Sequence, residues 1–83
     1  MTILQAIQHA RLVQINGHTL LKRYACDPAG ALLADDIVLK AWADGGELEL
    51  TLDDIAGAVE LEPNAYRLRS GAVLWFYRRA TVH

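Results

Sequence analysis

The sequence predicts an α+β fold in which a short N-terminal helix is followed by a curved antiparallel β-meander or half-open barrel. Three observations predict it. A helix-capping pattern opens the chain, an Asn16-Gly17 pair separates two apolar runs, and short strand-like runs alternate with tight turns over residues 58–79. The 83 residues are expected to form a single domain, residues 1–83, because a chain of this length has no room for a second core.

Composition excludes several protein classes. Hydrophobic residues make up 53% of the chain and charged residues 22%, which is typical of a globular domain and unlike a disordered or fibrous chain. The longest apolar run, residues 72–77, is too short to span a membrane as a helix, and the first residues lack the pattern of a signal peptide. A single cysteine, Cys26, cannot form an internal disulfide. We therefore expect a cytoplasmic protein with a free thiol.

The helix is expected over residues 2–10. Thr2 and Gln5 match the T-x-x-Q capping box, in which each residue's side chain satisfies the backbone N–H of the other. Apolar residues then fall on one helical face, at Ile3, Leu4, Ile7 and Ala10. A helix of this length must dock on a sheet to persist.

The first hairpin is expected around Asn16-Gly17, because both residues tolerate positive φ. A two-residue loop there pairs Val13 with Leu20 and keeps one face of the hairpin apolar. Residues 27–30 (DPAG) then end the second strand. The segment 31–36 (ALLADD) fits either a loop or one helical turn.

A second hairpin is expected over residues 36–52, with Gly45-Gly46 as its loop and Ala41 opposite Leu50. A three-residue loop, which would shift this register by one residue, remains an alternative. A single helical turn follows in TLDDIAG (51–57), since aspartates suit its N-terminal end and a glycine its C-terminal end.

The last third of the chain is expected to form three strands. A Pro63-Asn64 loop would place Glu60 opposite Arg67, and a Ser70-Gly71 loop would place Leu68 opposite Val73. These registers give one inner face, made of Val59, Leu61, Tyr66, Leu68, Val73, Trp75 and Tyr77.

The last strand is apolar on both faces. In the expected register Leu74 and Phe76 point away from the inner face, although both are strongly apolar. Such a strand must be covered twice, by the helix or another layer of the fold, or by a second copy of the chain.

Charge is unevenly distributed along the chain. Residues 1–26 carry +3, residues 27–62 carry −9 and residues 63–83 carry +4. Basic strands could neutralise acidic neighbours across the sheet, or the two signs could form separate recognition surfaces.

No catalytic residue, metal ligand set or cofactor is expected. His18 and Cys26 lie eight residues apart in one expected strand, roughly 26 Å, so they cannot form a nucleophile–base pair within it. The histidines have no metal-ligand spacing and stand alone, at His9, His18 and His83.

One patch has the chemistry of nucleic-acid binding. Aromatic residues of the last two strands interleave with four arginines, Arg67, Arg69, Arg78 and Arg79, a combination that can hold phosphates and bases. A sequence pI near 5.8 argues against nucleic acid as a partner, because nucleic-acid modules are usually strongly basic.

The order of the segments resembles a small uncharacterised bacterial protein family known from pseudomonads. The resembling stretches are residues 3–20 (ILQAIQHARLVQINGHTL), 48–61 (LELTLDDIAGAVEL) and 65–78 (AYRLRSGAVLWFYR). The resemblance implies an α+β fold with a helix, a hydrophobic strand and an antiparallel meander. The family has no assigned activity, so the resemblance assigns no role to any residue.

Three functional hypotheses follow. The leading one is a non-catalytic cytoplasmic protein-interaction domain that forms a homodimer through the last strand, using Leu74, Phe76 and Trp42. The second is binding of single-stranded nucleic acid by the C-terminal arginines. The third is a small ligand-binding or enzymatic domain, which requires one cleft to bring together His9, His18, Tyr24 or Cys26.

Overall fold

The N-terminal helix forms as the capping pattern predicts. In the structure, a computed structural model that describes residues 2–30 and 33–78, helix α1 spans Ile3–His9. The Thr2 hydroxyl accepts a hydrogen bond from the Gln5 backbone N–H at 3.2 Å, and Gln5 Oε1 accepts one from the Thr2 N–H at 2.9 Å. Ile7 is fully buried, so the helix is held by its contact with the sheet as well as by its cap.

Within residues 2–30 and 33–78, seven antiparallel strands form one sheet in the order β4-β3-β2-β1-β7-β6-β5. Their bounds are β1 Leu12–Ile15, β2 His18–Ala25, β3 Ile37–Ala43, β4 Gly46–Thr51, β5 Val59–Glu62, β6 Ala65–Arg67 and β7 Val73–Tyr77. Two three-stranded meanders, β2-β3-β4 and β5-β6-β7, are joined because β1 pairs with both β2 and β7. The α+β fold class with a short helix before an antiparallel sheet is therefore confirmed.

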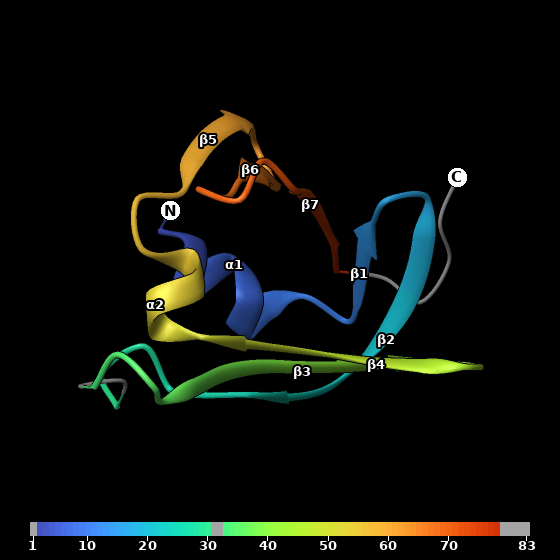
Figure 1. Ribbon diagram of the computed structural model, residues 1–83, viewed down its shortest axis with the longest axis horizontal. Helices are drawn as coiled ribbons and strands as arrows, with labels where there is room; N and C mark the ends of the chain where they lie inside the picture. The colour runs from blue at the N-terminus through green and yellow to red at the C-terminus, as the bar shows by residue number, and fades with distance from the viewer. Residues whose placement is uncertain (1, 31–32, 79–83) are drawn as a thin grey trace.

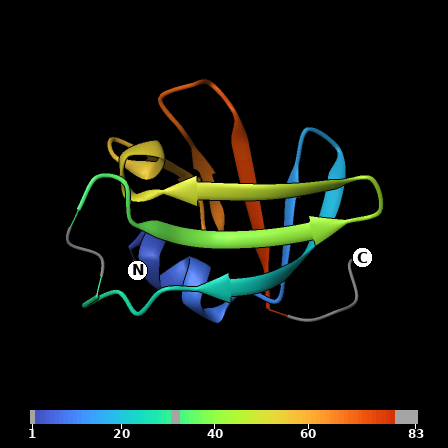
Figure 2. The same ribbon diagram turned by 60° about the horizontal axis from the view of Figure 1, so that its bottom comes forward.

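The sheet is curved but not closed into a barrel. It bends around α1, with β2, β3 and β4 on one side of the helix and β1 and β7 turning up from them (Figure 1). A second short helix, α2 (Leu52–Ile55), leads from β4 to β5, and Figure 2 shows α1 behind the level of β3 and β2. Strands β4 and β5 are the two edges of the sheet. The largest fully buried side chains lie between the helices and the sheet: Ile7, Leu39, Leu74, Val13 and Val38.

The first hairpin has the predicted register. Val13 lies opposite Leu20 and Ile15 opposite His18. Asn16 has a φ of 51° and Gly17 a φ of 80°, the pair of positive values that a two-residue hairpin turn of this kind requires.

The second hairpin turns one position earlier than predicted. Asp44-Gly45 forms the loop, with Gly45 at a φ of 88°, and Gly46 already belongs to β4. Ala41 therefore lies opposite Leu48 instead of Leu50. The displacement is two residues, an even number, so every side chain keeps its predicted face of the sheet.

The β5–β6 hairpin has the predicted Pro63-Asn64 turn but contains a bulge. Glu62 pairs with Ala65 as expected, and the register then shifts between Glu60 and Glu62. Glu60 consequently lies opposite Tyr66 and accepts a hydrogen bond from its hydroxyl at 3.1 Å. The predicted pair of Glu60 with Arg67 was wrong, because the extra residue of the bulge displaces the partner by one.

The β6–β7 register also differs from the prediction, by one residue. Arg67 lies opposite Val73, and the connection is a longer loop closed by hydrogen bonds from the Leu68 N–H to the Ala72 carbonyl and from the Gly71 N–H to the Leu68 carbonyl. A slip of one residue reverses which face of β7 meets the core.

The prediction of which face of the last strand meets the core was therefore wrong. Leu74 is 0% exposed and Phe76 is also buried, whereas Trp75 is 37% exposed on the opposite face. Of the predicted inner face, Tyr66 and Leu68 are buried, but Val59 and Leu61 are exposed. The observation that β7 is apolar on both faces still holds, with the two faces exchanged.

Two further expectations concern the middle of the chain. The described part of segment 31–36 is a turn, in which the Asp36 N–H donates to the Leu33 carbonyl and the Leu33 N–H donates to the Asp36 carboxylate. The helical turn expected in 51–57 is α2, capped by Thr51 and followed by Gly57 at a φ of 77°. None of the helices in residues 2–30 and 33–78 is long and apolar enough to cross a membrane.

Candidate functional site

An apolar row crosses the outer face of the sheet, the face turned away from α1. Its members are cross-strand neighbours on four adjacent strands: Leu12 lies opposite both Tyr77 and Leu21, and Leu21 lies opposite Trp42. We call Tyr77, Leu12, Leu21 and Trp42 the outer apolar row. Leu21 is 43% exposed and Trp42 is 42% exposed, so large apolar side chains of this row face solvent in the single chain.

Charged side chains of opposite sign flank the row. On the β2 side, the Arg23 guanidinium lies over the Trp42 ring, 5.2 Å from its centroid. On the β4 side, Glu47 lies opposite Trp42, and Glu49 is 3.9 Å from Lys40 Nζ. The outer face therefore carries the basic Arg23 on the β2 side of Trp42 and acidic residues on the β4 side.

The predicted interface residues separate into two groups. Leu74 and Phe76 are buried in the chain's own core, so they cannot meet a partner while the protein is folded. Trp42 is exposed and lies in the outer apolar row. Sequence reasoning missed Leu21, although the correct first register already placed Leu12 and Leu21 opposite each other on the face away from Val13.

The described arginines among those proposed for nucleic-acid binding, Arg67, Arg69 and Arg78, lie at separate places in the fold. Arg69 donates to the Asp53 carbonyl at 2.9 Å and lies 3.3 Å from its carboxylate, so it is tied to α2. Arg67 pairs with the first residue of β7, whereas Arg78 follows the last residue of that strand. Arg79 lies outside the described residues.

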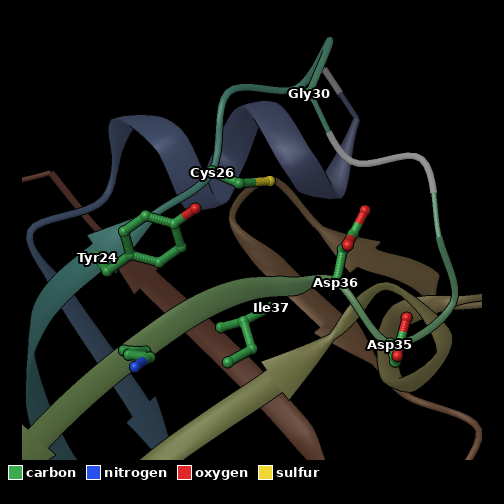
Figure 3. A pocket seen from close by; sticks show the side chains of 7 residues that line it. Tyr24, Cys26, Gly30, Asp35, Asp36 and Ile37 are labelled. Carbon is green, nitrogen blue, oxygen red and sulfur yellow. The ribbon is translucent and has the colours of Figure 1, made fainter.

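A separate open pocket of about 580 Å³ lies where β2 ends and β3 begins. Tyr24, Cys26, Asp36 and Ile37 contribute to its lining, and the Tyr24, Cys26 and Asp36 side chains point toward the opening between the two strands (Figure 3). The turn beside it is anchored on α2, since the Leu52 N–H donates to the Asp36 carbonyl at 2.9 Å.

The chemistry of this pocket does not favour nucleophilic attack. Burial raises the pKa of the Cys26 thiol, and the charges of Asp27 and Asp36 raise it further, so the reactive thiolate is disfavoured. His9 lines a cavity beside α1 and His18 lines one beside the hairpin turns, so neither reaches Cys26 in this pocket. Of the residues named for the enzymatic hypothesis, Tyr24 and Cys26 line this pocket together, whereas His9 and His18 line other cavities.

Metal binding also finds no support in the described part of the chain. Among residues 2–30 and 33–78, no three His, Cys, Asp or Glu side chains are grouped so that they could hold a metal ion.

Comparison of the chain with protein-family models, with curated proteins and with solved structures gives no match. The resemblance to the pseudomonad family therefore stays a prediction, and functional argument rests on the geometry of the chain itself.

Proposed function

We propose that this protein is a protein-interaction domain that associates with a second copy of itself through the outer apolar row. The observation that carries the proposal is the row itself, with Leu21 and Trp42 both more than two-fifths exposed on one continuous surface. Large exposed apolar side chains that neighbour each other on adjacent strands are typical of interaction surfaces, although Leu12 of the row is only 9% exposed. A cytoplasmic location remains the expectation from the single cysteine.

The charges beside the row favour a second copy as the occupant. A two-fold axis parallel to the strands, between β2 and β3, would place Trp42 of each copy on Leu21 of the other. The same axis would bring the acidic β4 flank of one copy, with Glu47, toward the β2 side of the other copy, where Arg23 lies over Trp42. A surface with an apolar centre and opposite charges on its two sides is complementary to itself in this arrangement.

The sheet edges are poor alternatives for self-association. Edge strand β4 carries Glu47 and Glu49, and edge strand β5 carries Glu60 and Glu62. Pairing either edge with its own copy would bring acidic side chains together, a common way in which proteins prevent edge-to-edge contact. Association is therefore expected through the face of the sheet.

Sedimentation velocity over a wide concentration range tests this proposal. The wild-type chain is expected to show a concentration-dependent dimer, and Trp42→Glu is expected to remove it, because a carboxylate would be buried in the apolar centre. Leu33→Glu is the matched control, since Leu33 is 63% exposed in the turn before β3 and lies off the row. A strictly monomeric wild-type chain at high concentration would contradict the proposal.

A charge exchange tests the arrangement of the two copies. Glu47→Arg makes both flanks basic and Arg23→Glu reverses the basic flank, so each variant alone is expected to associate less than the wild type. An equimolar mixture of the two is expected to associate more strongly than either variant alone, because unlike charges then meet. A mixture no stronger than the single variants would rule out this two-fold arrangement.

A further inference from the structure

A basic cavity of about 460 Å³ lies beside the outer apolar row, between the end of α1 and strands β1 and β2. Four residues able to carry positive charge are among its lining residues, His9, Arg11, Lys22 and Arg23, and no carboxylate is among the described ones. Three segments of the chain supply these groups, and β1 and β2 are held together here by the hydrogen bond from the Lys22 N–H to the Arg11 carbonyl at 2.9 Å.

Two of the cations are already fixed in place. The Lys22 ammonium donates to the Ile7 carbonyl at 3.1 Å and to the Gln8 carbonyl at 2.8 Å, which neutralises the negative end of α1. Arg23 is held by its contact with the Trp42 ring. Fixed cations lose little conformational freedom when an anion binds.

The pKa of Lys22 is shifted in the direction opposite to the shift that a bound anion would cause. Partial burial lowers the pKa of the Lys22 ammonium, because the charged form loses water. An anion in the cavity would compensate for that loss.

We propose that this cavity binds the phosphate group of a small ligand. A phosphate has three oxygens that can accept from guanidinium forks and an ammonium together, and it matches a site with several cations and no acid better than a single carboxylate does. The site belongs to the single chain and does not depend on dimer formation. The phosphate could be inorganic or belong to a nucleoside monophosphate.

Amide NMR titrations of the full chain test this site, with inorganic phosphate and adenosine monophosphate as separate probes. They are run below the protein concentration at which association is detected, so that the result is independent of the dimer. Shifts are expected at Arg11, Lys22 and Arg23. Arg11→Gln and Arg23→Gln are each expected to weaken binding by about tenfold, the value of one charge-assisted hydrogen bond. Arg67→Gln is the control, and Lys22 is left intact because it stabilises the end of α1.

The outcomes separate the ligand sources. Equal affinity for the two probes indicates a phosphate site, and tighter binding of adenosine monophosphate indicates a nucleotide site. Either result supports the proposal if Arg67→Gln leaves the affinity unchanged. The proposal is overturned if neither probe shifts these amides, or if Arg67→Gln weakens binding as much as Arg11→Gln.

Discussion

Replacing two neighbouring residues of β7 with alanine tests which face of the last strand meets the core. Leu74 is 0% exposed, whereas Val73 is partly exposed on the outer face. Leu74→Ala removes buried methyl groups and leaves a cavity in a packed interior, which costs about 3 kcal/mol. Val73→Ala removes groups that already contact water, and is expected to cost about 1 kcal/mol or less.

The difference is large for a protein of this size. A chain of 83 residues has a free energy of unfolding of roughly 4 to 12 kcal/mol, so Leu74→Ala would remove a quarter or more of it. Urea denaturation followed by circular dichroism measures both variants. With a denaturant slope of about 1 kcal/mol per molar, the midpoint should fall by about 3 M for Leu74→Ala and by about 1 M or less for Val73→Ala. A larger loss for Val73→Ala would refute this register and support a Leu68–Val73 pairing.

Four further predictions use other contacts of the structure. Tyr66→Phe should lower the free energy of unfolding by about 1 kcal/mol at neutral pH, because it removes the hydroxyl that donates to Glu60. Burial and the Glu60 bond and charge raise the pKa of Tyr66. The Tyr66 hydroxyl therefore stabilises the fold below the pKa it has in the unfolded chain, and this contribution is lost as the pH rises through its higher pKa in the folded chain. Above about pH 10, the urea midpoint should fall less in Tyr66→Phe than in the wild type. Cys26 should react with a thiol reagent at pH 8 at least about tenfold more slowly in the folded chain than in urea, since burial raises its pKa; equal rates would contradict this. Gly45→Ala should lower stability by about 1 kcal/mol in thermal or urea unfolding, because its φ of 88° is strained for any other residue, whereas Gly46→Ala should cost less. Phosphate should weaken self-association measured by sedimentation, because it would occupy the cations that face the partner's acidic flank, and an unchanged dimer at saturating phosphate would show that the two sites are independent.

Local signals in the sequence predicted the elements that depend on neighbouring residues. The capping box of Thr2 and Gln5 defines α1, and Asn16-Gly17 defines the first hairpin with its full register. In both cases the hydrogen bonds or backbone angles that stabilise the element come from residues within three positions of one another.

The errors occur where one extra residue decides a register. The Leu61 bulge and the longer loop before β7 each displace a pairing by one position, and turn composition alone does not reveal either. Apolar patterning could not correct the second error, because Val73, Leu74, Trp75 and Phe76 are all apolar and fit either face. The error at the Asp44-Gly45 turn had less consequence, because it displaced the β3–β4 pairing by two residues and each side chain kept its predicted face of the sheet.

The candidate site was predicted only in part, because it depends on a pairing between distant segments. β1 pairs with both β2 and β7, which brings Tyr77 beside Leu12 and extends the row across four strands. Local turn signals connect only strands that are neighbours in sequence, so they give no information on the β1–β7 pairing. Trp42 was expected at an interface, and its neighbours in the row follow from this long-range pairing.

The most direct test of the central claim is a measurement of contact between two copies. A dimer prepared from equal amounts of ¹³C,¹⁵N-labelled and unlabelled chain gives isotope-filtered nuclear Overhauser effects only between copies. The two-fold arrangement predicts such effects between the Trp42 indole of one copy and the Leu21 methyl groups of the other, and their absence in Trp42→Glu. Intermolecular effects confined to β5 or to other surfaces, with none at Trp42, would contradict it.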